Sequence, residues 1–134
     1  MIIKKPNNVY IEAAIDFLDN QTIITKQISG RKVIESKYNS YISSFGGSII
    51  QSGLLATLKI FEANDEKNKI IEALFYLLNS REKVSQIEKT KNNYYKTIKI
   101  YNNDQANKIR DELIEMAVSL KLAMRCFEQV ENTN

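Results

Sequence analysis

The sequence predicts an all-α protein: a single compact bundle of about six helices that ends in a long C-terminal helix. Apolar residues recur at steps of three and four through most of the chain, as they do on the buried face of a helix. The only proline is Pro6, so no later helix is interrupted by one. The 134 residues, 43% of them hydrophobic, suit one domain. We expect this domain to span residues 1–134, with frayed ends at 1–7 and 130–134.

The first half of the chain is expected to contain three helices. The first begins near Asn8, whose side chain can cap it. Its apolar face consists of Tyr10, Ile11, Ala14, Ile15, Phe17 and Leu18. Residues 20–30 lose this periodicity and are interpreted as a connection. A second helix over about 31–45 follows, with a buried stripe of Ile34, Tyr38, Tyr41 or Ile42, and Phe45.

Glycines divide the second helix from the third in this prediction. Gly46 and Gly47 are expected to end the second helix, and Gly53 is placed inside a third helix over about 48–63, where it costs roughly 1 kcal/mol relative to alanine. The apolar positions of this third helix are Ile50, Leu54, Leu58 and Phe61. A phosphate-binding loop is disfavoured because Leu54 and Leu55 follow Gly53, where a P-loop has lysine and a serine or threonine.

The second half is expected to contain a helix over about 66–79, short irregular helices over 80–102, and the long last helix. Acidic residues at the start of the 66–79 helix suit its N-terminus. Its packing residues are Ile70, Ile71, Leu74, Phe75 and Leu78. Asn102 and Gln105 form a capping box for the last helix, which is expected to reach about Glu128. The apolar face of that helix consists of Ile109, Leu113, Met116, Ala117, Leu120, Met124 and Phe127.

The composition excludes several classes of chemistry. The chain has no histidine, so neither Ser–His nor Cys–His catalysis is possible within it. Cys126 is the only cysteine and is interpreted as a buried or half-buried inert thiol. The start of the sequence lacks the pattern of a secretory signal, and no apolar run approaches the roughly 18 residues of a membrane span. We therefore expect a cytoplasmic protein that is not an enzyme and needs no cofactor or metal.

Charged residues supply the candidate sites. Asp111, Glu112 and Glu115 could serve a Mg²⁺-dependent nuclease, but a solvated acidic face accounts for them more simply. The net charge is +3, which is compatible with a nucleic-acid partner. Basic residues near the start of the second helix and along the last helix are candidates for RNA phosphate binding. These are Arg31, Lys32, Lys37, Lys121 and Arg125.

One stretch resembles a known family. The segment "KYNSYISSFGGSIIQSGLLATLKIFE" is similar to the central signature of the small helical subunit of the type III-B CRISPR effector, the Cmr complex. The matching positions are Tyr38, Ser40, Gly46 and Gly47, Ile49 and Ile50, Gly53 and Leu54, and Leu58 to Phe61. The segment "AVSLKLAMRCFEQ" resembles the closing helix of that family. The resemblance spans about residues 8–130, and the chain departs from it by having two glycines where a proline is common.

The resemblance implies a non-catalytic subunit of an RNA-guided complex in antiviral defence. Its partners would be the other Cmr subunits, especially the backbone subunit, further copies of itself, and the guide RNA–target RNA duplex. Copies would stack into a minor filament that helps to hold this duplex. The alternative is a helical protein–protein adaptor without direct RNA contact, and no membrane partner is expected.

Overall fold

The fold is described from a computed structural model, which describes residues 8–79 and 103–131. The helices among these residues are α1 (Asn8–Asn20), α2 (Lys37–Ser52), α3 (Leu54–Glu62), α4 (Asp65–Asn79) and α6 (Asn103–Met124). The strands are β1 (Thr25–Ile28), β2 (Arg31–Glu35) and β3 (Glu128–Val130). The protein is therefore mainly helical, as predicted, but it is not purely α.

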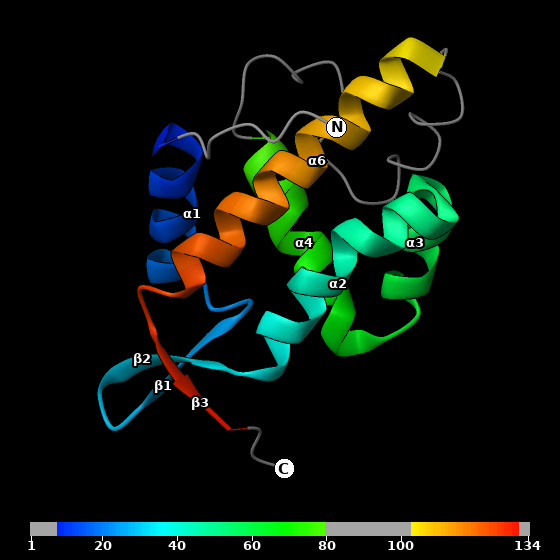
Figure 1. Cartoon of the computed structure of the whole chain (residues 1–134). Helices are drawn as coiled ribbons and strands as arrows, with labels where there is room; N and C mark the ends of the chain where they lie inside the picture. Colours follow the sequence, from blue (N-terminus) through cyan, green and yellow to red (C-terminus); the bar gives the residue numbers. More distant parts are fainter. Residues whose placement is uncertain (1–7, 80–102, 132–134) are drawn as a thin grey trace.

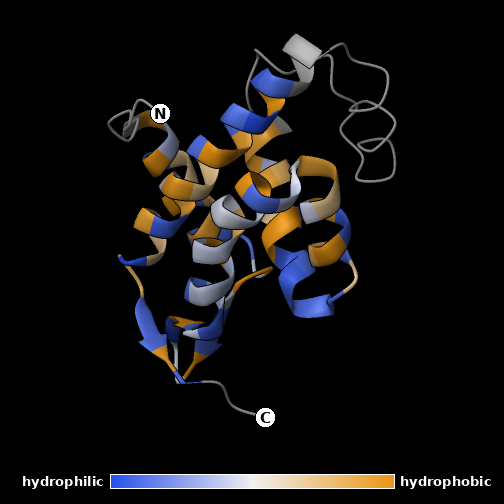
Figure 2. Ribbon diagram, turned by 45° about the vertical axis from the view of Figure 1, so that its right-hand side comes forward, coloured by the Kyte–Doolittle hydropathy of each residue, from blue (hydrophilic) through white to orange (hydrophobic). Residues whose placement is uncertain are grey.

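The helices form a bundle around α6, which packs against α1, α2 and α4 (Figure 1). α3 packs against α2 and α4. Large side chains from four helices are fully buried where they meet, among them Leu18, Phe45, Leu74 and Leu120. The hydrophobic residues are concentrated in these helices, whereas the strands are mostly hydrophilic (Figure 2). Both views place the sheet at one end of the bundle.

The three-stranded sheet contradicts the prediction that the chain has no strand. β1 and β2 form an antiparallel hairpin, and β3 pairs with β2 in parallel. The two loop residues of the hairpin, Ser29 and Gly30, have φ of 54° and 79°. Positive φ at both positions is typical of the two-residue turns that match the twist of a hairpin. The segments interpreted as a connection and as the start of the second helix are thus two paired strands.

The predicted roles of the glycines are also wrong. α2 continues through Gly46 and Gly47. The break between α2 and α3 lies at Gly53, which has φ of 84° and ψ of 166°. The buried stripe of α2 explains its continuity, because it extends past both glycines. The stripe consists of Tyr38, Ile42, Phe45 and Ile49. Ile50, expected in the apolar face of a third helix, is 69% exposed near the end of α2.

The remaining helices agree with the prediction to different extents. α1 begins at Asn8 and α4 spans Asp65–Asn79, close to the predicted bounds. α3 begins at Leu54 rather than near residue 48, because the helix break lies later than predicted. α6 ends at Met124 rather than near Glu128, because Glu128–Val130 form β3. The predicted helices in 80–102 and the capping residue Asn102 lie outside the described residues.

Candidate nucleic-acid interface

The sheet separates two of the candidate RNA-binding residues, Arg31 and Lys32. Successive side chains of a strand point to opposite faces of its sheet, so these two neighbours on β2 cannot line one surface. The Arg31 Nη1 atom donates to Glu128 Oε1 of β3 at 2.8 Å. The Lys32 Nζ atom lies 2.6 Å from Asp19 Oδ1 and also donates to the Asp19 carbonyl at the end of α1. Each cation already has an intramolecular carboxylate partner.

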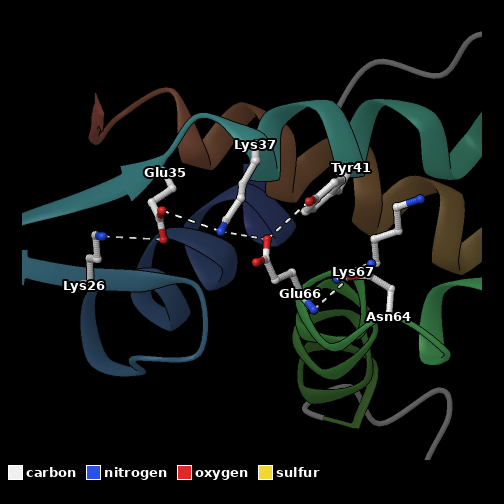
Figure 3. Close-up of polar contacts among 7 residues, drawn as sticks. All are labelled: Lys26, Glu35, Lys37, Tyr41, Asn64, Glu66 and Lys67. Atoms are coloured by element: carbon white, nitrogen blue, oxygen red, sulfur yellow. Dashed lines mark hydrogen bonds and ion pairs between the residues drawn. The ribbon is translucent and has the colours of Figure 1, made fainter. Parts of the chain in front are cut away.

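Lys37 is more enclosed than Arg31 and Lys32. It is the first residue of α2, and its side chain is 17% exposed. Its Nζ atom lies 2.7 Å from Glu66 Oε2 of α4 and 3.6 Å from Glu35 Oε2 of β2 (Figure 3). The Tyr41 hydroxyl donates to the same Glu66 oxygen at 3.3 Å. Lys37 therefore joins a strand and two helices.

The ionisation of this cluster follows from its contacts. The hydrogen bond to Glu66 raises the pKa of Lys37 above its ordinary value, although partial burial opposes this shift. The same hydrogen bond lowers the pKa of Glu66. Burial, reinforced by the Glu66 charge, raises the pKa of the Tyr41 hydroxyl. At neutral pH the cluster thus holds a charged lysine, a charged carboxylate and a neutral phenol.

Lys121 and Arg125 have a different environment at the end of α6. Lys121 lies in the last turn of the helix and is partly buried, and Arg125 is the exposed residue just beyond the helix. No carboxylate of the described residues forms an ion pair with either of them. Arg110, farther up the same helix, pairs with Asp111 at 3.1 Å. Lys121 and Arg125 are therefore the two candidate cations that have no carboxylate partner in residues 8–79 and 103–131.

The remaining predictions concern metal sites, the cysteine and membrane spans. In the described ranges, no three His, Cys, Asp or Glu side chains converge so as to hold a metal ion. The Cys126 thiol is exposed, contrary to the expected burial, because it lies in the turn between α6 and β3. None of the helices within residues 8–79 and 103–131 is long and apolar enough to cross a membrane.

Sequence reasoning missed the carboxylates that pair with the predicted cations. Glu66 was recognised only as an acidic residue at a helix N-terminus, and Glu35 was placed inside a helix. The hairpin register gives no signal for Glu35, because it ends at the pair of Thr25 and Ile34 and places Lys26 opposite Val33. No local signal pairs Lys37 with Glu66 either, because they belong to different helices.

Comparison with known proteins places the chain in a family. A family model described as "CRISPR-associated protein (Cas_Cmr5)" matches residues 21–126. No curated protein and no solved structure gives a significant match. The matched range covers the sheet hairpin, the Gly53 junction and all of α6, so it includes the first segment that carries the sequence resemblance and most of the second, which ends at Gln129. The chain therefore belongs to the Cmr5 family of CRISPR-associated proteins, which are small subunits of the type III-B Cmr complex.

Proposed function

We propose that this chain is a non-catalytic small subunit whose copies stack head to tail beside the backbone subunit and help to hold the guide RNA–target RNA duplex. Membership of the Cmr5 family supports its place in the complex. The observation that carries the RNA contact is the pair of cations at the end of α6. Lys121 and Arg125 have no carboxylate partner among the described residues, so a phosphate can bind them without displacing one.

The proposed mechanism is electrostatic. Lysine and arginine side chains neutralise phosphates of the duplex and release condensed counterions. Such contacts fix the position of the nucleic acid but do not distinguish its bases. Sequence recognition is supplied by the guide, as in other RNA-guided effectors. Stacking of copies requires a heterologous contact between two different surfaces of the same chain.

Arg31 and Lys32 would contribute to this function only by exchanging partners. Both ion pairs are solvent-exposed, with side chains 63% and 38% exposed for the two cations. Exposed pairs of this kind contribute little stability, typically about 0.2–1 kcal/mol, so a phosphate can compete with the carboxylate. Because the two residues lie on opposite faces of the sheet, we propose that at most one of them contacts a given strand of RNA.

The test is the salt dependence of target RNA binding by the reconstituted complex. The double variant Lys121→Met with Arg125→Met should weaken binding and reduce the slope of log K against log salt, by roughly 0.7–0.9 for each lost phosphate contact. Lys69→Met, an exposed lysine of α4, is the matched control and should leave the slope unchanged. Native mass spectrometry must show that each variant enters the complex in normal copy number.

The alternative is an adaptor that contacts only protein. One observation favours it: three of the five candidate cations are already paired with carboxylates of the chain. An adaptor predicts that the double variant at Lys121 and Arg125 binds target RNA with the same affinity and the same salt slope as the native chain. That result, with assembly intact, would rule out the RNA contact and retain the adaptor.

A further inference from the structure

We propose that Lys37 is a positioning residue, which fixes the β1–β2 hairpin against the start of α4, and that it does not itself bind phosphate. The RNA part of this inference rests on the proposed function, because the hairpin carries Arg31 and Lys32. The structural part does not depend on RNA. It states that the Lys37 ammonium group contacts Glu35 and Glu66 in the folded chain.

The charged groups around Lys37 form a continuous row of alternating sign (Figure 3). Lys26 of β1 lies 3.5 Å from Glu35 of β2, and Lys37 lies 3.6 Å from the other oxygen of Glu35. Lys37 then contacts Glu66 of α4 at 2.7 Å, and Glu66 accepts a hydrogen bond from Tyr41. The row therefore connects both strands of the hairpin to α2 and to the first turn of α4.

Burial makes Lys37 difficult to withdraw from this row. The Glu35 side chain is only 13% exposed, and its Oε2 atom is buried without a hydrogen-bond partner among the described residues. Lys37 is the cation that faces this oxygen. An ionised carboxylate that loses its cation in a partly buried site is strongly destabilised. Binding a phosphate through Lys37 would leave both Glu35 and Glu66 without that cation.

The start of α4 is a suitable anchor for the hairpin. The Asn64 side chain caps the helix, since its Oδ1 accepts hydrogen bonds from the amides of Glu66 and Lys67 at 3.0 Å. The Lys67 ammonium lies 5.8 Å from the centre of the Tyr41 ring and 5.6 Å from that of Phe61. Glu66 is thereby held in place by its own helix and by α2, so it can fix Lys37.

The other end of the row controls the hairpin. Glu35 is the last residue of β2, and the next amide, that of Ser36, donates to the Val130 carbonyl of β3 at 2.8 Å. Arg31 and Lys32 lie at the opposite end of β2, beside the exposed loop of Ser29 and Gly30. If the Glu35 end is released from Lys37, we expect this end of the hairpin to loosen, so that the cations at its tip are held less firmly.

The experiment compares Lys37→Met, Glu66→Gln, the double variant with both changes, and Lys37→Arg, with Lys108→Met, an exposed lysine of α6, as control. Amide hydrogen exchange of residues 25–35 is measured in the full chain. Each single change should accelerate exchange in the hairpin, and the double variant should exchange no faster than the faster single variant, because both remove one interaction. Lys37→Arg, which keeps the charge, should retain most of the protection, and Lys108→Met should change nothing.

Target RNA binding by the assembled complex supplies the second measurement. For a positioning residue, Lys37→Met and Glu66→Gln both weaken binding and change the salt slope alike, because each releases the hairpin that carries Arg31 and Lys32. A direct phosphate contact instead lowers the slope in Lys37→Met alone, by roughly 0.7–0.9. It also makes Glu66→Gln bind RNA more tightly, because that change removes a competing negative charge.

These outcomes separate the inference from the proposed function. Unchanged hairpin exchange in Lys37→Met and Glu66→Gln, or the lowered slope together with tighter binding by Glu66→Gln, would overturn the positioning role. If the native complex shows no salt-dependent RNA contact through this subunit, the proposed function fails, and hydrogen exchange still decides whether Lys37 holds the hairpin. If Lys37→Met does not fold, Glu66→Gln and Lys37→Arg carry the same test, since Glu66 is 44% exposed and the substitution keeps its shape.

Discussion

Alanine substitutions at three glycines should have opposite effects on stability. Gly53 separates α2 from α3 with φ of 84° and ψ of 166°, a backbone conformation that only glycine adopts readily. Gly46 and Gly47 lie inside α2 with helical backbone, and a Cβ atom added at either one meets nothing within 4 Å. Gly53→Ala should therefore strain the junction, whereas Gly46→Ala and Gly47→Ala should fit without a clash.

The expected magnitudes follow from these conformations. A residue held in a sparsely populated region costs about 1–3 kcal/mol, so Gly53→Ala should lower the free energy of unfolding by that amount. Each α2 substitution should raise it by roughly 0.5–1 kcal/mol, because alanine loses less backbone entropy in a helix. For a chain of this size, 1 kcal/mol corresponds to a shift in melting temperature of roughly 3–5 °C.

The assay is urea denaturation of the three single variants, followed by circular dichroism, with equal m-values as the control for an unchanged unfolding transition. The reasoning is refuted if Gly46→Ala or Gly47→Ala destabilises the chain as much as Gly53→Ala. That result would place the helix break at Gly46 and Gly47, as the sequence alone had predicted.

Three further substitutions test other parts of the structure. Phe45→Ala removes a fully buried ring that packs edge-on against Phe61 at 5.5 Å and should cost about 3–5 kcal/mol in a denaturant titration; a loss below 1 kcal/mol would contradict its place in the core. Thr25→Val removes a buried hydroxyl that donates to the Leu18 carbonyl at 2.7 Å and should cost about 1–3 kcal/mol, whereas an unchanged midpoint would contradict this bond. The pKa of Glu66 is lower in the folded chain than its ordinary value of 4.5, so its contribution to stability is complete above that pH and is lost as the pH falls through the folded pKa. The difference in stability between the native chain and Glu66→Gln should therefore shrink in acid, and a constant difference down to strongly acidic pH would count against the ion pair.

The helices with a long uninterrupted apolar stripe could be predicted from the sequence. α1, α4 and α6 bury residues at steps of three and four, and their cores contain expected residues such as Phe17, Leu74 and Leu120. The predicted starts of α1 and α4 agree within one residue with the observed starts at Asn8 and Asp65, whereas α6 ends at Met124 rather than near Glu128. Periodic burial over several turns is the strongest local signal of a helix.

The sheet was missed because its strands are short and mostly hydrophilic. In β2 only Val33 and Ile34 are buried, and Arg31 and Lys32 are exposed, so the alternation typical of a half-buried strand is absent. Ile34 also lies four residues before Tyr38. This helical spacing led to the prediction that the second helix begins near residue 31. The dipeptide of Ser29 and Gly30 was the usable signal, since serine followed by glycine is typical of a turn.

The glycine error has a similar origin. Two adjacent glycines are weak helix formers, which favoured a break at Gly46 and Gly47. The tertiary structure overrides this preference, because burial of Phe45 and Ile49 on one face requires the helix to continue between them. Positive φ at Gly53 depends on how α3 packs against α2 and α4, and local sequence does not specify that arrangement.

Only the positions of the candidate cations along the chain were available from the sequence. From charge alone, Lys37 and Arg125 were equal candidates for phosphate binding. The fold distinguishes them, because Lys37 is enclosed between Glu35 and Glu66, whereas Arg125 is exposed and unpaired among the described residues. A cation's availability for phosphate is thus decided by carboxylates that come from other elements of the fold.

Photo-crosslinking within the assembled complex tests the proposed function most directly. A photoreactive amino acid is placed at position 121 or at position 12, where the native residues are Lys121 at the end of α6 and the exposed Glu12 of α1, and radiolabelled target RNA is added. The account predicts RNA adducts from position 121, reduced at high salt, and none from position 12. Adducts from position 121 that contain only protein, in a complex with target RNA bound, would contradict the proposed RNA contact.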